Sequence, residues 1–566
     1  MTSAVLTPKI ESNMEVDFIA VGSGMGASCA ALAAQAQGLE TVILEKSEVF
    51  GGGTTYSYGI VWVGDNHLER ALGIKDSQEA AYAYLHHLAA GHEMESNLRA
   101  YIKTSPEALK FFCDDVGIPF YVVPGFPDYF QGMANGSLGE GRNLQVRPFE
   151  SKSLGEWHQH LRAAPAVTHR ATLEEVAGWG GRAQPQNWDR QLIRERMEQD
   201  VRTFGAGLVG HLMTAVLRRN IPFYLDTDVR SLIVEDGRVQ GVIAKQGNHE
   251  FRIMARKGVL LATGSNVRNE ALTERSSEFH ATKSLLPHSV DGDAIVLAGE
   301  IGGAVSIKPQ FQQDLLYVIP GEERYGTPLY RGVTNNESGF PHCILVNLDG
   351  NRFSDESIGQ QVGATLRNFD VRRHRYVNVP CFLVFDQTYL DKYGLGSIQP
   401  SQDVPDWLIR SETIKGLAQG LGVDGEKLTK TIQRFNKFAE AGKDEDFGRG
   451  EFPFANSVSG DLSHKPNPNL GPLDQPPYYG LPLEPAAAGS TRLVTNELAQ
   501  VMHLRGQAIP GLYACGSASA HYYGIGYQAG CELGGAMTFG YLAARHAASG
   551  RILRRVWLNR TVGPPP

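Results

Sequence analysis

Hydrophobic runs near the start of the chain predict one β-α-β unit. The apolar stretch at 16–21 is typical of a short buried strand, and the alanine-rich run at 28–37, after a glycine turn, is typical of a packed helix. A second apolar stretch at 41–44 predicts the strand that follows. Since strand, helix and strand succeed one another directly, we expect the unit to begin near residue 15.

Helical and strand patterns continue to alternate after this unit. They predict helices at 76–90, 96–116 and 191–219, and strands through 223–253 and at 258–261. From about 290 to 485, loops rich in glycine and proline separate short strands, with one clear helix at 425–441. A strand at 509–514 and a helix at 536–548 resume the first pattern. We therefore expect the chain to leave an α/β domain near 288 and to return to it near 486.

Length and charge narrow the class of protein. A chain of 566 residues is too long for one hydrophobic core, so two or more structural units are expected. The net charge of -8 gives no electrostatic reason to expect nucleic acid as a partner. No apolar run approaches the ~18 residues of a transmembrane helix, and Met1 to Ser12 lack the apolar core of a secretory signal. We expect neither a nucleic-acid partner nor a transmembrane segment.

The cysteines point away from a metal site. Six cysteines lie scattered along the chain, without a C-x-x-C pair and without the spacing of metal ligands. Free thiols are typical of a reducing compartment, so we expect a cytoplasmic location and no bound metal.

The turn after the first strand carries a dinucleotide-binding pattern. Gly22-Ser23-Gly24-Met-Gly-Ala27 fits G-x-G-x-x-G/A: Gly22 permits the tight turn, Gly24 lets a pyrophosphate approach, and Ala27 allows close helix–strand packing. The helix N-terminus offers N–H groups to the phosphates. Glu45 closes the second strand, 23 residues after Gly22, where a carboxylate binds ribose hydroxyls. The alternative is a glycine-rich turn with a purely structural role.

A second glycine loop follows soon after Glu45. Gly51-Gly52-Gly-Thr54-Thr-Tyr-Ser57-Tyr-Gly59 combines backbone freedom with hydroxyl donors, which suits a flavin better than a nicotinamide. Taken alone, a loop of this composition is equally consistent with a simple turn.

Together these motifs resemble the fumarate reductase/succinate dehydrogenase flavoprotein superfamily, and within it the branch of 3-ketosteroid dehydrogenases. Matches run over most of the chain, among them Gly125-Phe-Pro-Asp-Tyr129, Gly205-Ala-Gly-Leu-Val209, Leu260-Leu-Ala-Thr-Gly264, Val346-Asn-Leu-Asp-Gly-Asn-Arg-Phe-Ser-Asp-Glu356 and Pro510-Gly-Leu-Tyr-Ala-Cys-Gly516. The resemblance implies an α/β fold with a Rossmann-type FAD-binding domain, discontinuous in sequence, and an inserted mixed α+β substrate (cap) domain. The implied parts are a tail at 1–12, FAD-binding segments at 13–287 and 486–556, a substrate domain at 288–485 and a tail at 557–566.

The resemblance also implies a set of FAD-binding residues. Besides the glycines, Glu45 and Ala27, it adds Ser23, Lys46, Thr54, Ser57, Val229, Ala262, Thr263, Gly264, Gly516, Ser517 and Leu533. Respiratory relatives attach flavin to a histidine near the second loop, but here Tyr56 and Tyr58 occupy that loop and no histidine precedes His67. We expect a noncovalent FAD.

Catalytic residues are likewise implied by the resemblance. In ketosteroid 1-dehydrogenases a tyrosine and a glycine N–H polarise the ketone, and the matching residues are Tyr527 and Gly530. Tyr129 is implied at the substrate face, with Phe126 packing against the substrate ring. The alternatives are a packed loop tyrosine and a structural aromatic turn.

The chain departs from the family at the general base. Ketosteroid 1-dehydrogenases carry a tyrosine, and fumarate reductases an arginine, where this chain has Gln360, and glutamine cannot titrate. Tyr129 is the first candidate for the displaced role, with Tyr325, Tyr330 and His342 as others. The arginine with which fumarate reductases clamp a dicarboxylate is also missing, because His521 is followed by Tyr-Tyr-Gly.

The sequence therefore predicts an FAD-dependent dehydrogenase that introduces a C=C bond next to the carbonyl of a cyclic ketone. The substrate is a 3-ketosteroid or a smaller cyclic ketone, and the electron acceptor is a quinone or an electron-carrier protein. A flavin-dependent enone or fumarate-type reductase, and an inactive flavin-binding paralogue, remain the alternatives.

Overall fold

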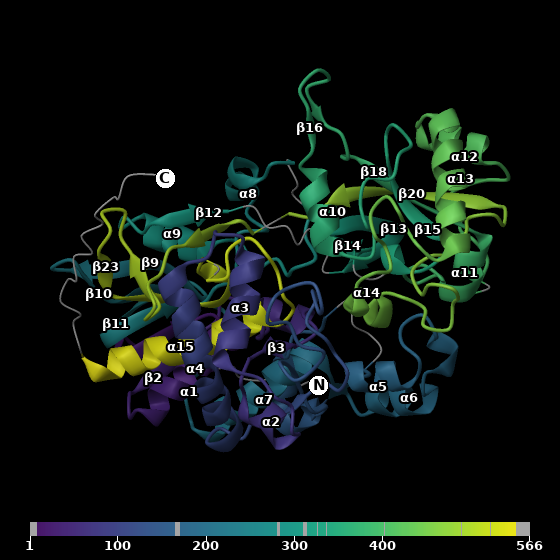
Figure 1. Ribbon diagram of the computed structural model, residues 1–566. Coiled ribbons are helices and arrows are strands. Elements are labelled where there is room, and N and C mark those ends of the chain that lie inside the picture. Colours follow the sequence, from purple (N-terminus) through teal and green to yellow (C-terminus); the bar gives the residue numbers. More distant parts are fainter. Residues whose placement is uncertain are drawn as a thin grey trace, which may run out of the picture.

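The computed structural model describes residues 8–164, 170–279, 283–308, 314–324, 327–334, 337–400, 402–487, 489–520 and 522–550. Most of the expected tail 1–12 and all of the expected tail 557–566 lie outside these ranges, as do Tyr325 and His521. The described residues form two main β-sheets, each covered by helices, on opposite sides of the molecule (Figure 1).

The first sheet collects strands from both ends of the chain. It consists of β1 (Met14–Val21), β2 (Thr41–Leu44), β8 (Phe223–Tyr224), β9 (Thr227–Glu235), β10 (Arg238–Gln246), β11 (His249–Leu261), β22 (Gln500–Met502) and β23 (Ala508–Ala514). The order is β22-β23-β11-β1-β2-β8, and the four pairs from β23 to β8 are parallel. β9 and β10 add an antiparallel extension beside β11.

Alternate residues of β1 pack on opposite faces of this sheet. Phe18 and Ala20 join a core formed with α1 (Met25–Ala36), α4 (Glu95–Asp114), α7 (Phe204–Arg218) and α15 (Cys531–Ser549). Ile19 and Val21 join a second core, formed with β9, β10 and α9 (Asp293–Gly299). Because both faces of the strand are buried, its sequence is almost continuously apolar instead of alternating.

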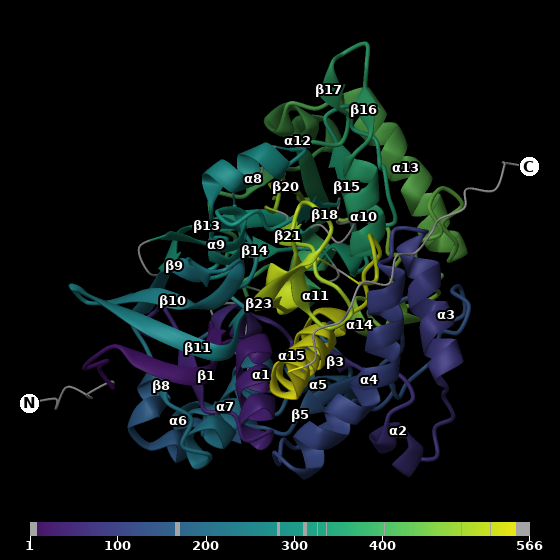
Figure 2. The same ribbon diagram turned by 90° about the vertical axis from the view of Figure 1, so that its left-hand side faces the viewer.

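Helices α1 and α15 lie side by side next to the strands of the first sheet (Figure 2). A Cβ added to Gly540 of α15 would lie 2.8 Å from the carbonyl oxygen of Gly26 and 3.5 Å from the Cβ of Ala30, both in α1. A side chain at Gly540 would therefore push the two helices apart. The C-terminal helix is fixed in this way against the first helix of the chain.

The helix predicted at 191–219 is broken, so that prediction was wrong. α6 (Arg190–Glu198) ends before β7 (Val201–Arg202), which pairs with β6 (Phe149–Glu150), and α7 begins only at Phe204. Asp200, between the two helices, has a φ of 55°, which lies outside the right-handed helical region and interrupts the helix. The break depends on pairing with a distant strand, which local periodicity does not reveal.

Several short elements lie between residues 61 and 178. They are β3 (Val61–Trp62), α2 (His67–Ala71), α3 (Gln78–Ala89), β4 (Phe120–Val122), β5 (Asn143–Val146) and α5 (Leu173–Gly178). β3, β5 and β4 form a small antiparallel sheet. None of the helices in the described ranges is long and apolar enough to span a bilayer.

The second sheet is antiparallel and has a core on each face. It runs β14 (Thr327–Gly332), β13 (Leu315–Arg324), β20 (Tyr478–Pro485), β18 (Cys381–Asp386) and β15 (Cys343–Asn347), with β19 (Ile409–Ser411) beside β20. α12 (Ile414–Leu421) and α13 (Gly425–Ala441) cover one face, and α10 (Gly359–Leu366) and α11 (Gln387–Tyr393) the other. The bounds of α13 match the helix predicted from the sequence.

The chain passes from one sheet to the other and back along paired strands. β12 (Val305–Ile307) pairs with β21 (Thr491–Leu493), and further along Leu315 of β13 pairs with Pro485 of β20. α9 and β21 both contribute to the core of the first sheet. The outgoing and returning segments therefore run side by side.

We expect Gly540→Val to destabilise the protein by about 1–3 kcal/mol, because its side chain overpacks the crossing of α1 and α15. Chemical denaturation should show a lower midpoint for this variant. Gly178→Val at the end of α5 is the matched control, because a Cβ added there has no neighbour within 4 Å. Equal midpoints for the two variants would contradict the close-packing argument.

Candidate active site

The turn between β1 and α1 brings backbone close to a cavity. Gly22 has a φ of 107°, and a Cβ there would lie 2.5 Å from the carbonyl oxygen of Ala262, so only glycine fits. At the start of α1, the Met25 N–H donates to Thr54 Oγ1 at 3.1 Å. A Cβ on Gly24 would lie 3.1 Å from the same oxygen. The helix N-terminus and a hydroxyl thus border a space suited to a phosphate.

Ser23 joins the two glycine loops to Glu45. The Ser23 hydroxyl donates to the Glu45 carboxylate at 2.5 Å and accepts from the Gly51 N–H at 2.8 Å. The other carboxylate oxygen of Glu45 accepts from the Ser47 N–H at 2.9 Å. These hydrogen bonds fix the carboxylate at the end of β2, on the wall of the cavity.

The second glycine loop packs against the start of α7. A Cβ on Gly205 would lie 1.8 Å from the carbonyl oxygen of Thr54, and a Cβ on Gly59 would lie 2.5 Å from the carbonyl carbon of Phe204. Within the loop, Ser57 donates to the Thr54 carbonyl at 2.8 Å. The glycine motif at 205–209 is therefore explained by the close approach of this loop.

One cavity of about 1170 Å³ unites most of the predicted cofactor residues. Fifteen of the eighteen predicted cofactor residues line its wall: Gly22, Ser23, Gly24, Glu45, Lys46, Gly52, Thr54, Ser57, Val229, Ala262, Thr263, Gly264, Gly516, Ser517 and Leu533. Ala27, Gly51 and Gly59 lie behind this wall and support it by packing and backbone hydrogen bonds. The glycine turn after β1, the N-terminus of α1 and the Glu45 carboxylate together fit an FAD.

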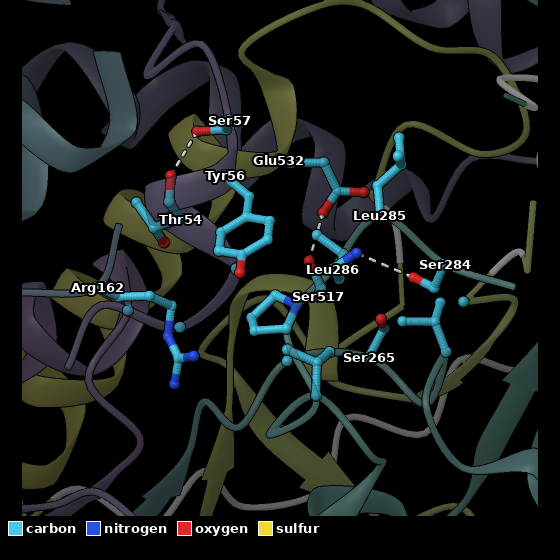
Figure 3. A pocket seen from close by; sticks show the side chains of 18 of the residues that line it. Thr54, Tyr56, Ser57, Arg162, Ser265, Ser284, Leu285, Leu286, Ser517 and Glu532 are labelled. Atoms are coloured by element: carbon cyan, nitrogen blue, oxygen red, sulfur yellow. Dashed lines mark hydrogen bonds between the residues drawn. The ribbon is translucent and has the colours of Figure 1, made fainter. Parts of the chain in front are cut away.

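Figure 3 shows the middle of this cavity, with Thr54, Tyr56 and Ser57 from the second glycine loop and Ser517 and Glu532 from the C-terminal segment. Ser517 donates to Glu532 at 3.1 Å, and Arg492 lies 3.2 Å from the same carboxylate. The polar groups here come from opposite ends of the chain.

Lys46 lies on the cavity wall, but its ammonium group is bound to protein carboxylates. It lies 2.5 Å from Asp291 and 2.8 Å from Asp293. Burial raises the pKa of Asp293 to about 6, against the opposing effect of the Lys46 charge. Lys46 thus connects the end of β2 to the start of α9.

The arginines on the cavity wall, among them Arg162 and Arg268, were not predicted from the sequence. Arg162 (labelled in Figure 3) donates to the Val49 carbonyl at 3.4 Å, and Arg268 donates to the Leu286 carbonyl at 2.6 Å. Both come from loops without a recognisable motif. Their charges suit the phosphates of a dinucleotide.

The four residues predicted to be catalytic gather at the other end of the same cavity. Phe126, Tyr129, Tyr527 and Gly530 all line it. The rings of Tyr129 and Tyr527 are 5.9 Å apart between centroids, and Phe454 lies 3.8 Å from the ring of Tyr129. Burial raises the pKa of both tyrosines above that of an ordinary phenol, so both hydroxyls are protonated and available as donors.

Three donors at this end have no protein acceptor. Within the described ranges, the hydroxyls of Tyr129 and Tyr527 and the N–H of Gly530 make no hydrogen bond to the protein. Gly530 stands at the start of α15 with a φ of 87°, and its carbonyl accepts from the Trp62 N–H at 3.1 Å. Donors in a shaped cavity without partners are typical of a ligand site.

A buried network holds the Tyr129 segment in place. Gln528 accepts from the Tyr129 N–H at 2.9 Å and from the Tyr84 hydroxyl at 2.5 Å. Next to Tyr129, the carboxylate of Asp128 pairs with Arg142 at 2.9 Å and accepts from the Trp62 indole N–H at 2.8 Å. Tyr129 and Tyr527 are thus positioned by the residues beside them in sequence.

Gln360 binds the backbone of Tyr527. Its amide nitrogen donates to the Tyr527 carbonyl at 2.5 Å, and its amide oxygen accepts from the Tyr527 N–H at 2.9 Å. Both polar atoms of the side chain are therefore used in holding the tyrosine. The residue at the family's base position is a clamp on the neighbouring loop.

The other suggested bases differ in position. Tyr330 lines the cavity, whereas Tyr325 lies outside the described residues. His342 packs against His464 beyond the cavity wall, its Nδ1–H donates to the Pro472 carbonyl, and burial lowers its pKa to about 4. Asp314, which the sequence analysis did not consider, also lines the cavity.

Comparison with known proteins agrees with this geometry. A family model described as an FAD binding domain matches residues 17–535. The chain is 32% identical to a 3-oxosteroid 1-dehydrogenase of Mycobacterium tuberculosis, over 94% of this chain and 98% of that one. It is also 32% identical to the 4-oxocyclohexanecarboxylate 2-dehydrogenase of Sinomonas cyclohexanicum, over 94% and 92%.

Among solved structures, the 3-ketosteroid delta1-dehydrogenase of Sterolibacterium denitrificans, in complex with 1,4-androstadiene-3,17-dione, superposes with a TM-score of 0.87. It shares 30% sequence identity, over 95% of this chain and 100% of that one. These findings confirm the predicted resemblance, the mixed α/β fold with an FAD-binding domain, and FAD as cofactor. The chain therefore belongs to the flavoprotein family defined by this FAD binding domain, together with 3-oxosteroid 1-dehydrogenases, and is an FAD-dependent oxidoreductase.

Proposed function

We propose that this dehydrogenase introduces a C=C bond next to the carbonyl of a cyclic ketone, a 3-ketosteroid or a smaller ring. The observation that carries the proposal is the group of unpartnered donors, Tyr527, Gly530 and Tyr129, in the same cavity as the flavin residues. Relatives that act on 3-oxosteroids and on 4-oxocyclohexanecarboxylate support a ring-shaped ketone as substrate.

The donors suit the first half of the reaction. A ketone oxygen held by the Tyr527 hydroxyl and the Gly530 N–H gains negative charge as the α-proton leaves, and fixed donors stabilise that charge. Bound FAD supplies a two-electron acceptor for the β-hydride. Phe126, Tyr129 and Phe454 form an aromatic wall against which an apolar ring packs.

We further propose that the first sheet belongs to a Rossmann-type FAD domain split in sequence, with the second sheet as an inserted substrate domain. The parallel strand order and the glycine turn after β1 support this assignment. Because α9 and β12 accompany the first sheet, we place the outgoing boundary near 308 instead of 288, and the return near 486.

Location and electron acceptor are proposed on chemical grounds. All six cysteines are free thiols, five of them buried, which suits a reducing compartment such as the cytoplasm. A quinone or an electron-carrier protein would reoxidise the flavin.

The proposed function predicts that a cyclic ketone bleaches the flavin. Under anaerobic conditions, 4-oxocyclohexanecarboxylate or a 3-oxosteroid should abolish the yellow absorbance and give an enone lighter by two hydrogens. Absorbance spectroscopy and mass spectrometry check both signs. If no ketone of a panel bleaches the flavin, and if the chemically reduced enzyme reduces an enone, the reductase is favoured instead.

Two variants test the assigned carbonyl site. Tyr527→Phe should lower kcat by a factor on the order of 10²–10³, the loss typical of one oxyanion donor, with FAD content unchanged. Gln360→Ala should cost less, because Gln360 positions Tyr527 without touching the ketone. Gln361→Ala, at the next position of α10, is its matched control. Steady-state kinetics decide, and near-normal turnover in Tyr527→Phe would place the carbonyl elsewhere.

We propose that FAD is held noncovalently. Acid precipitation should therefore release yellow flavin into the supernatant, because no covalent bond keeps it on the denatured chain. Flavin absorbance of supernatant and pellet measures the partition. Colour that stays with the pellet after repeated washing would show a covalent attachment.

A further inference from the structure

The reaction needs a proton acceptor that the family pattern does not supply. Gln360 cannot titrate, and both polar atoms of its side chain are bound to Tyr527. Tyr129, the first candidate from the sequence, has a pKa raised by burial, so it holds its proton more firmly than a free phenol does. The acceptor must therefore come from another group on the cavity wall.

Asp314 lies where the chain enters the second sheet, directly before β13. Its carbonyl accepts from the Ala486 N–H at 2.8 Å, which ties it to the returning segment of the chain. Its Oδ1 accepts from the Thr334 hydroxyl. A Cβ on Gly332 would lie 3.5 Å from the Asp314 carboxyl carbon and 3.4 Å from Leu285, which is labelled in Figure 3. A side chain at Gly332 would therefore be in van der Waals contact with the carboxylate.

The carboxylate of Asp314 has no cation beside it. In the described part of the chain, Asp314 forms no ion pair, and its Oδ2 accepts no hydrogen bond. Asp314 lines the same cavity as Tyr129 and Tyr527, and its charge adds to the raised pKa of both tyrosines, after the larger effect of their burial.

The other carboxylates of the cavity are engaged elsewhere. Glu45 accepts hydrogen bonds from Ser23 and Ser47, Asp293 pairs with Lys46, and Glu532 lies beside Arg492. The Glu337 charge raises the pKa of Tyr317 and Tyr389 after their burial, so it faces the core of the second sheet. Glu48, Asp226 and Asp228 line the cavity beside Glu45, since the Asp226 N–H donates to the Ser47 carbonyl and the Thr227 N–H to the Glu45 carbonyl. This leaves Asp314 as the cavity carboxylate that we assign to the ketone.

We propose that Asp314 is the catalytic base that accepts the α-proton of the ketone, the role that Gln360 cannot perform. The proposal rests on the proposed desaturation. The α C–H bond breaks, its proton forms an O–H bond on Asp314 Oδ2, and its electron pair enters the enolate whose oxygen is held by Tyr527 and Gly530. As the C=C bond forms, the enolate electrons restore the carbonyl and the β-hydride leaves to the oxidised FAD already named as acceptor.

The surroundings of Asp314 suit this task. Burial raises the pKa of the carboxyl, which makes its carboxylate a stronger base than one in water, and the Thr334 hydrogen bond limits the rise. Thr334 is thus a positioning residue that acts through Asp314. Asp314 stands where the outgoing and returning segments of the chain pair.

The test follows proton removal without net oxidation. The purified holoenzyme is reduced chemically under anaerobic conditions and mixed with 4-oxocyclohexanecarboxylate or a 3-oxosteroid in D2O, and NMR follows deuterium entering the α-carbon. Wild-type enzyme should exchange these hydrogens faster than buffer does. Asp314→Asn should slow the exchange by about 10²-fold or more, with unchanged FAD content. Asp403→Asn, at an exposed position, is the matched control and should exchange like wild type.

Further variants keep the outcome decisive. Thr334→Val should slow exchange less than Asp314→Asn does, and Thr334→Ser should restore it, since serine keeps the hydroxyl. If Asp314→Asn loses its FAD, the Thr334 pair still tests the proposal, and equal exchange in Thr334→Val and Thr334→Ser overturns it. An Asp314→Asn enzyme that exchanges like wild type also overturns it and leaves the desaturase proposal intact. A wild-type enzyme that neither exchanges nor desaturates any ketone overturns the proposed function itself.

Discussion

The cavity depends on three parallel strands that end level with one another. Val21 of β1 pairs with Leu261 of β11, and Leu261 pairs with Ala514 of β23. Each strand end is followed by small residues, and the crevice at the carboxyl ends of parallel strands is where such sheets bind ligands. The register of these strands therefore brings together the segments after Val21 and after Ala514, which lie nearly 500 residues apart in sequence. The α15 helix and the Tyr527 loop follow directly from the last of the three strands.

Much of the first sheet and its cofactor loops can be predicted from local sequence patterns. The first β-α-β unit, both glycine loops and Glu45 each have a short-range signature, because a tight turn and a close backbone approach restrict which residues fit. The C-terminal helix was predicted only from 536, although α15 begins at Cys531. Gly534 and Gly535 lower the helix propensity of its first turn, so the sequence did not predict helix there. Glycine is needed at both positions because the backbone of Trp62 and the ring of Tyr522 approach closely.

The parts that escaped prediction depend on contacts between distant segments. Arg162 and Asp314 come from loops without a motif, and only the folded chain brings them to the cavity. Sequence correctly indicates that Gln360 cannot be a base, but its role as a clamp on Tyr527 requires a hydrogen-bond pair across 167 residues. Tertiary geometry decides such roles, whereas local pattern decides turns and strands.

The paired outgoing and returning segments have a consequence for how such an enzyme can change. Because β12 pairs with β21 and β13 with β20, the outgoing and returning covalent connections of the second sheet run together as a two-stranded stem. Chain ends that lie side by side can be cut and rejoined with little disturbance, which is the condition for exchanging one module for another. A recombination that replaces everything beyond the stem would keep the flavin machinery and present it with a new specificity module. Asp314, which directly precedes β13, would be lost with the replaced segment, so an inserted module would have to supply its own proton acceptor.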